Sequence, residues 1–406
     1  MTRLFPSSQS GQLVNLDRLD AVLAVENVDA LVASSPENVT YASGYWALSQ
    51  WIRRGPQTYV VIPRKAQDRS AVVASTALLD LLADQDVWVP NLRRFGYFQM
   101  DRAAGLLSSL DEKLLGFFGL PDDGTPLEAL AMALTDAGVA KARIAIDELG
   151  LLPGDWEHLQ DLLPNATLVP GSGLFRTIRA IKTPEEINRL RYVAQAAEHA
   201  IQAALAEARS DITEIEMARA FHRKTVESDC QPVLGCIGFG PRSAMPNVQP
   251  SDARLVEGDL IRFDVGGRFK HYRADIARVA VFGEPSAKIK SYHRALHRGV
   301  QAALEMIKPG VKAADVFARA VDITRREGIN HFARSHVGHG IGIDGYDLPD
   351  LTPTSPDIIE AGMVMCVEAP YYEIGWGGLQ VEDTVVVRDD GIETFMITDG
   401  RLRVSP

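Results

Sequence analysis

Residues 259–283 read DLIRFDVGGRFKHYRADIARVAVFG, two apolar, strand-like runs joined by the turn-like segment GGRFKH. The first run carries Asp264 and the second follows Asp275. A β-hairpin through the turn would bring these two carboxylates close together. A single aspartate at such a place is often only a strand-end or turn residue. The pair therefore has to be judged with the residues that follow it.

A second pair of strand-like runs, VMCVEAPYY and LQVEDTVVV, places Glu368 and Glu382 among apolar neighbours. A carboxylate in such a run is costly unless it is ion-paired or bound to a metal. His339 lies between the two pairs in HVGHGIGIDGY, where glycines allow a close approach of backbone and metal. Four carboxylates and one imidazole suit divalent ions such as Mn²⁺, Co²⁺, Fe²⁺ or Zn²⁺. The sequence therefore predicts a metal site made by Asp264, Asp275, His339, Glu368 and Glu382.

The chain has 406 residues, a length that favours two domains. Residues 1 to about 170 read as alternating short strands and helices, which is typical of an α/β domain with a mixed sheet. Within them, PENVTYASGY at 36–45 is expected to be a polar, turn-rich stretch. Later helices and strands come in pairs, which favours an α+β domain with an antiparallel sheet. We expect the domains to span residues 1–172 and 173–406.

Two capping-box patterns predict helix N-termini in the second domain. Thr183 and Glu186 form a capping box around Pro184, a residue favoured at the first helical position. Thr213 and Glu216 repeat the capping-box pattern. Each box predicts an amphipathic helix ahead of the ligand-bearing strands.

Composition and charge limit the class of protein. The net charge is −11, which argues against nucleic-acid binding because phosphates need a basic face. No apolar run approaches the ~20 residues of a membrane span, and the N-terminus has no run of signal-peptide length. Three scattered cysteines suit a reducing compartment, so we expect a cytoplasmic protein. No Gly-x-Gly-x-x-Gly follows a strand of the first domain, which disfavours a dinucleotide site.

The order Asp, Asp, His, Glu, Glu, together with GHGIG around His339 and VEDT at 381–384, resembles the pita-bread metallopeptidases. This family includes creatinase, prolidase and aminopeptidase P. The resemblance covers nearly the whole chain, since LVASSPENVTYASGYW at 31–46 is similar to the start of a creatinase-type N-terminal domain. It implies an α/β creatinase-like domain followed by an α+β pita-bread catalytic domain.

The resemblance also implies a hydrolase of the Xaa-Pro dipeptidase or aminopeptidase type that binds two divalent metal ions. Mn²⁺ is the first expectation for these ions, and Co²⁺, Zn²⁺ or Fe²⁺ are the alternatives. Asp264 and Asp275 would bind one ion and His339 and Glu368 the other, with Asp275 and Glu382 bridging. A metal-bridging water would then attack an amide carbonyl. Glu368 is the candidate for carrying its proton, and His336 is a candidate beside it or at the substrate.

Three positions depart from the peptidase pattern. Asn247 and Tyr346 stand where relatives have histidines that contact substrate or transition state, and Gln380 stands where they have an arginine that supports the metal carboxylates. Asn247 can still donate a hydrogen bond, and Tyr346 can donate one to an oxyanion. Gln380 can orient a ligand carboxylate without compensating its charge.

These departures leave alternatives open. One is a metal-dependent non-peptidase of the same fold that acts on a small C–N substrate, or a lyase. A binding protein on an inactive scaffold is another, but it predicts eroded ligands, and all five are present. The resemblance further implies a homodimer in which a loop of the first domain reaches the partner's site. Arg53 and Arg54 are candidates in that loop for binding a substrate carboxylate.

Overall fold

The computed structural model describes residues 12–51 and 57–405, and the chain divides into two compact units between Arg179 and Ala180. The first unit includes helix α8 (Ser172–Arg179), at whose start the sequence placed the domain boundary. Among the described residues, no helix is both long and apolar enough to cross a bilayer.

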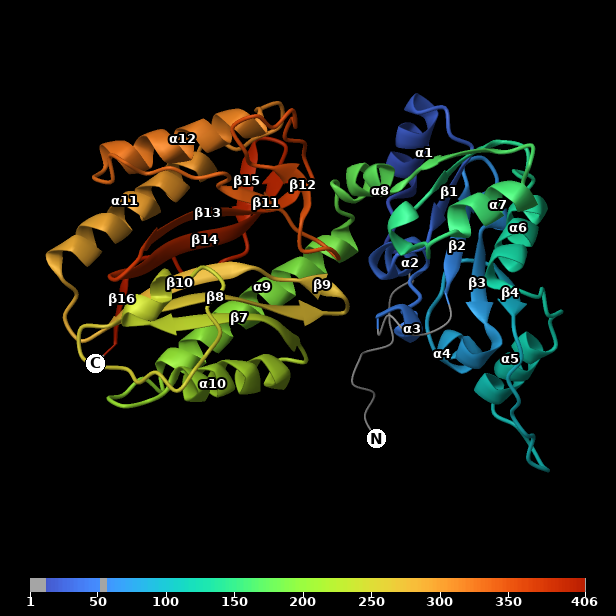
Figure 1. The fold of residues 1–406 in the computed structure, drawn as a ribbon, viewed down its shortest axis with the longest axis horizontal. Coiled ribbons are helices and arrows are strands. Elements are labelled where there is room, and N and C mark those ends of the chain that lie inside the picture. Colours follow the sequence, from blue (N-terminus) through green and yellow to red (C-terminus); the bar gives the residue numbers. More distant parts are fainter. Residues whose placement is uncertain (1–11, 52–56, 406) are drawn as a thin grey trace. The chain divides into compact units, whose positions relative to one another are not determined.

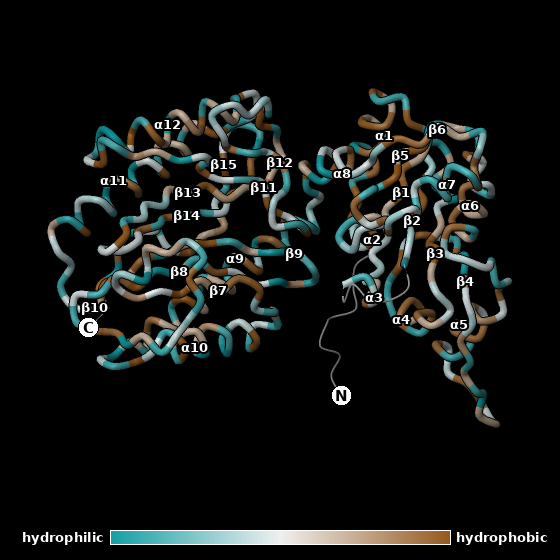
Figure 2. Tube along the Cα trace, viewed as in Figure 1, coloured by the Kyte–Doolittle hydropathy of each residue, from teal (hydrophilic) through white to brown (hydrophobic). Residues whose placement is uncertain are grey.

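The first unit is built on a six-stranded mixed sheet with the order β4-β3-β2-β1-β5-β6 (Figure 1). Strand β1 pairs antiparallel with β2 and parallel with β5, so antiparallel and parallel neighbours meet at the sheet centre. Its central strands carry hydrophobic residues, drawn brown in Figure 2, and they are buried along their whole length. The strands are β1 (Ala30–Ala33), β2 (Tyr59–Pro63), β3 (Ala71–Ser75), β4 (Asn91–Phe95), β5 (Arg143–Ile146) and β6 (Thr167–Pro170).

Helices fill the connections of this sheet, and α6 packs against β2, β3 and β4. They are α1 (Leu16–Val25), α2 (Pro36–Ser43), α3 (Leu48–Trp51), α4 (Leu79–Ala83), α5 (Ser109–Phe118), α6 (Pro126–Asp136), α7 (Asp155–Leu162) and α8. The alternation of strands and helices confirms the α/β fold expected for this part of the chain.

The prediction of a turn-rich stretch at 36–45 is wrong, because residues Pro36–Ser43 form helix α2. Pro36 occupies the start of the helix and Gly44 ends it in the left-handed conformation, at φ 79°. The buried carboxylate of Asp147, far along the chain, accepts from the backbone N–H of Ser35 at 2.9 Å and from Asn38 Nδ2 at 2.8 Å. Local polarity suggested a turn, whereas this long-range carboxylate satisfies the donors at the helix start.

The second unit contains two sheets, each covered by a pair of helices. The first sheet has the order β16-β10-β8-β7, with β9 paired to β8, and the second has the order β12-β11-β13-β14-β15. Helices α9 (Pro184–Leu205) and α10 (Glu214–Glu227) pack against β8 and β7, and α11 (Ala287–Leu304) packs against β13 and β14 beside α12 (Ala313–Arg326). Both predicted capping boxes are present, at Thr183–Glu186 and Thr213–Glu216.

Strand β14 contacts β8 and β10, so the two sheets meet along strands that carry or adjoin the predicted metal ligands. The predicted hairpin is present, since β8 and β10 pair antiparallel with Ala277 opposite Asp264. The strands of this unit are β7 (Gln231–Phe239), β8 (Leu260–Phe269), β9 (Tyr272–Arg273), β10 (Ile276–Phe282), β11 (Gly338–Gly340), β12 (Asp347–Asp350), β13 (Val364–Glu373), β14 (Gly377–Arg388), β15 (Gly391–Thr394) and β16 (Arg403–Ser405).

Candidate metal centre

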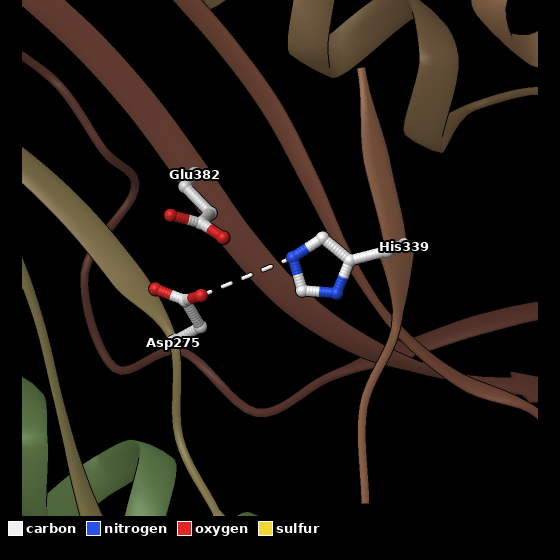
Figure 3. Close-up of side chains that lie close together, drawn as sticks. All are labelled: Asp275, His339 and Glu382. Atoms are coloured by element: carbon white, nitrogen blue, oxygen red, sulfur yellow. Dashed lines mark ion pairs between the residues drawn. The ribbon is translucent and has the colours of Figure 1, made fainter. Parts of the chain in front are cut away.

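Asp275, His339 and Glu382 come together from three different elements of the second unit. Asp275 immediately precedes β10, His339 is the central residue of β11, and Glu382 lies in β14. Their ligand atoms all lie within 4.8 Å of one another, and the side chains converge on one space in Figure 3. The Nε2 atom of His339 is 3.8 Å from Oδ2 of Asp275.

Glycines on both sides of His339 let β11 lie tightly between its neighbours. A Cβ atom on Gly338 would stand 2.1 Å from the carbonyl oxygen of Cys366, and one on Gly340 would stand 2.1 Å from that of Leu348. Neither position can hold a side chain without moving the backbone. The two glycines therefore allow β11 to pack closely against its neighbours, and this close packing fixes the position of the His339 imidazole.

The hydrogen bond of His339 defines which ring nitrogen is available. Nδ1 lies 3.0 Å from the carbonyl oxygen of Gly340, which can only accept, so Nδ1 carries the proton. The lone pair is then on Nε2, the nitrogen that faces Asp275. Burial lowers the pKa of His339, which keeps the ring neutral, as metal ligation requires.

Glu368 and Glu382 are direct cross-strand partners on β13 and β14 and therefore point to the same face. Both are buried, at 7% and 2% exposure. Asp264 lies on β8 of the other sheet, with its carboxylate 3.1 Å from Nη1 of Arg262.

Burial raises the pKa values of all four carboxylates; repulsion between them adds to the rise at Asp275, Glu368 and Glu382, whereas Arg262 opposes the rise at Asp264. Burial raises the pKa of Glu368 to about 7, with Asp264 adding to the rise. Burial followed by the charge of Asp264 and Glu368 holds the pKa of Asp275 well above its usual range. Glu382 is shifted in the same direction by burial and then by Asp275. Four neighbouring carboxylates carry more negative charge than Arg262, beside Asp264, can offset, and divalent cations would compensate the rest.

A carboxylate oxygen without a hydrogen-bond donor is a further sign that these residues suit a metal ion. Oδ1 of Asp275 is buried and accepts no hydrogen bond. A buried carboxylate oxygen without a donor is costly, and a coordinated cation would satisfy it. The orphaned oxygen, the oriented imidazole and the hard oxygen donors all suit a divalent ion.

The other predicted site residues surround this cluster. Nδ1 of His336 is 3.2 Å from Oε1 of Glu368, and burial followed by the charge of Arg334 lowers the pKa of His336. Nε2 of Gln380 donates to Oε2 of Glu368 at 3.0 Å. The ring of Tyr346 stacks on His339, with centroids 3.9 Å apart.

Tyr346 stays protonated in this place. Partial burial and the nearby carboxylates, Asp275 first, raise its pKa to about 12. Asn247 is exposed, in the segment that follows the short helix Gly240–Ala244. Arg53 and Arg54 lie outside the described residues.

Two arginines beside the carboxylates were not found from the sequence. Arg262 is completely buried and contacts both Asp264 and Gln380. Arg334 is half-buried, with its guanidinium 5.6 Å from the ring centroid of Tyr372. The signal for Arg262 was a charged residue inside the apolar run LIRFD, two positions before Asp264 and so on the same strand face. Arg334 gave no comparable signal.

Comparisons with known proteins agree with this architecture. The family model "Metallopeptidase family M24" matches residues 188–389, and "Creatinase/Prolidase N-terminal domain" matches residues 15–181. An Xaa-Pro dipeptidase of Lactobacillus helveticus is 25% identical over 97% of this chain and 99% of its own length. An uncharacterised peptidase of Staphylococcus aureus is 28% identical over 54% of this chain, and the match spans 63% of that relative's length.

A solved structure of an Xaa-Pro dipeptidase from Bacillus anthracis has the same fold, with a TM-score of 0.77, 22% identity, and coverage of 96% of this chain and 98% of that one. These matches confirm the predicted family, the fold of both domains and the expectation of a metal-dependent hydrolase, and they do not favour a non-peptidase. The chain belongs to metallopeptidase family M24 and carries a creatinase/prolidase-type N-terminal domain.

Proposed function

We propose that this chain is a dinuclear metallopeptidase that hydrolyses dipeptides of the Xaa-Pro type. The grouping of Asp275, His339 and Glu382, with ligand atoms within 4.8 Å, is the observation that carries the proposal. The substrate class is supported by the full-length similarity to the Lactobacillus helveticus relative, which is named an Xaa-Pro dipeptidase.

The five predicted ligands would divide between two ions. Asp264 and Asp275 would hold one ion, and His339 and Glu368 the other. Asp275 and Glu382 would serve both. The buried cross-strand pair of Glu368 and Glu382 and the raised pKa values of the carboxylates support this assignment, because two divalent charges would offset the repulsion.

When bound, the ions would polarise an amide carbonyl and make a coordinated water acidic. Oε1 of Glu368 faces His336 at 3.2 Å, which suits Glu368 to hold a proton and His336 to keep it oriented. The hydroxyl of Tyr346 would donate a hydrogen bond to the developing oxyanion. The exposed amide of Asn247 would contact the substrate backbone, and Gln380 would hold Glu368 in place.

Finer parts of the proposal concern the metal, the assembly and the location. Mn²⁺ is proposed because the donors are mostly carboxylates, which suit hard ions. A homodimer is proposed in which Arg53 and Arg54 bind a substrate carboxylate at the partner's site. The three cysteines are free and buried, which supports a cytoplasmic location. The acidic charge supports a protein without nucleic-acid or membrane partners.

The test is a substrate panel with metal-free protein reloaded with Mn²⁺. Ala-Pro and Leu-Pro are expected to be hydrolysed, with Ala-Ala as the matched control that lacks proline. A Glu382→Gln variant should bind less metal and lose most of its kcat/KM, because the metal activates the attacking water.

Two results would contradict the proposal in different ways. Full metal loading without hydrolysis of any Xaa-Pro dipeptide would remove the peptidase assignment while leaving the metal site. Failure to bind Mn²⁺ or Co²⁺ would remove the metal site itself.

A further inference from the structure

Arg262 is a fully buried cation in the middle of strand β8, with 0% exposure. A buried guanidinium is strongly unfavourable unless every donor and its charge are matched. Asp264 lies two residues further along the same strand, so both side chains leave on the same face. The arginine thus stands beside a proposed ligand carboxylate at a place where solvent cannot screen it.

Three backbone carbonyl oxygens hold the guanidinium still. Nε donates to the carbonyl of Ser243 at 2.9 Å, and Nη2 donates to those of Met245 at 2.6 Å and Pro246 at 2.9 Å. The ring of Tyr372 lies 5.1 Å from the guanidinium carbon. These contacts use two of the three nitrogens, so the remaining one has a defined direction.

The remaining nitrogen, Nη1, faces the carboxylate cluster. It donates to Oδ2 of Asp264 at 3.1 Å and to Oε1 of Gln380 at 2.9 Å. The hydroxyl of Tyr372 also donates to Oε1 of Gln380, at 3.1 Å. With two donors on its oxygen, Gln380 has to present its Nε2 to Glu368, which it contacts at 3.0 Å.

A continuous chain of contacts therefore runs from Arg262 on β8 through Gln380 on β14 to Glu368 on β13. This chain of contacts joins the two sheets of the second unit. Arg262 at one end contacts the proposed ligand Asp264 of the first sheet, and Gln380 contacts the proposed ligand Glu368 of the second. The neutral amide of Gln380 orients Glu368, while the positive charge lies on β8 of the other sheet, at Arg262.

We infer that Arg262 is the positioning residue that supplies positive charge to the ligand carboxylates Asp264 and Glu368, with Gln380 as its neutral adapter. The inference rests on the proposed metal site. It explains why position 380 needs no charge, because a cation there would stand against the buried guanidinium 2.9 Å away. The arginine at position 262 thus requires a neutral hydrogen-bond acceptor, such as glutamine, at position 380.

The experiment moves the charge from one strand to the other. The variants are Arg262→Met, Gln380→Arg, the double variant Arg262→Met/Gln380→Arg, and Arg268→Met as the control on the same strand. Arg268 contacts Gln231 outside the cluster. Metal-free proteins are titrated with Co²⁺, followed by the visible absorption band and by the dissociation constant, while far-ultraviolet circular dichroism checks folding.

Arg262→Met is expected to weaken Co²⁺ binding about 10–100-fold, as losses of supporting contacts around metal ligands do. Arg268→Met should bind like the wild type. Gln380→Arg should be destabilised, because it places two guanidinium groups together. The double variant should recover most of the affinity that Arg262→Met loses.

The inference is overturned if Arg262→Met keeps the wild-type affinity and spectrum, or if the double variant folds but binds no better than the single one. Should Arg262→Met fail to fold, a double variant that folds and binds Co²⁺ within about tenfold of wild type supports the inference. A double variant that also fails to fold overturns it. A wild-type chain that takes up no Co²⁺ would instead defeat the proposed function, and this inference with it.

Discussion

Glu368 and Glu382 stand directly opposite each other on β13 and β14, as two buried carboxylates in one cross-strand pair. Like charges in this arrangement destabilise a sheet. The strands are held together by buried apolar neighbours such as Val367 and Val381. The apolar core thus holds the two carboxylates together in spite of their repulsion, and a bound cation would reduce that repulsion.

Removal of metal should therefore lower the stability of the protein. We expect chelation at pH 8 to lower the melting temperature, and Mn²⁺ at a hundred times its dissociation constant to restore about 2.7 kcal/mol. Differential scanning calorimetry with and without chelator measures the change. The Glu382→Gln variant is the control, and its metal-dependent shift should be smaller. An identical melting temperature in both states of the wild type would contradict a metal at this site.

Replacing Tyr346 by phenylalanine should impair catalysis without emptying the site. The phenyl ring can keep the stack on His339, while the hydroxyl donor is lost. With its pKa raised to about 12, the tyrosine remains a donor over the whole range of a neutral assay. We expect kcat/KM for Ala-Pro to fall about 10²-fold, as for loss of one oxyanion donor, and metal content by plasma emission to stay unchanged. A variant as active as wild type would exclude this role.

Adding a methyl group at position 338 should displace the backbone of β11 and so disturb the metal site. Gly338 has a φ of 140°, and a Cβ there would stand 2.1 Å from the carbonyl oxygen of Cys366. Gly338→Ala should therefore lower the unfolding free energy by at least about 2 kcal/mol and weaken metal binding, because β11 and His339 have to shift.

The matched control for this change is Gly375→Ala. Gly375 also has a positive φ, 85°, but nothing lies within 4 Å of its added Cβ. It should cost only about 1 kcal/mol from backbone strain and leave metal affinity unchanged. Equal losses of metal affinity in the two variants would show that the close approach of β11 and β13 is not what fixes His339.

A pH-dependent contribution to stability is expected from Glu186, which is 1% exposed near the start of α9. It accepts from the backbone of Thr183 at 2.8 Å and from the hydroxyl of Tyr272 at 3.0 Å. Burial raises its pKa from 4.5 to about 7, with Lys182 opposing the rise. Between these values the folded state binds a proton that the unfolded state has released, so stability falls as pH rises from 4.5 to 7.

Comparison with Glu186→Gln isolates this group. The unfolding free energy of wild type relative to the variant should decline by roughly 2–3 kcal/mol between pH 5 and pH 8. Denaturant titrations at four pH values measure it. A difference that stays constant across this range would show that the folded-state pKa is not raised.

Much of the site could be predicted because the ligands come in locally defined pairs. The turn between Asp264 and Asp275 and the turn between Glu368 and Glu382 each produce an antiparallel pair of strands. Alternation along a strand then fixes the faces that Asp264, Glu368 and Glu382 take. The capping boxes at Thr183 and Thr213 are equally local, so the helix starts were readable from the sequence.

What the sequence by itself determined was the identity and order of the donor residues, and from these the family. The tertiary structure decided how the pairs combine: β14 contacts β8 and β10, which brings Asp275 to His339 and Glu382. The same contact joins Arg262 to Gln380, 118 residues apart. Helix α2 likewise depends on Asp147, a distant residue. Such partners are set by packing between sheets or across a sheet, and no local pattern in the chain encodes them.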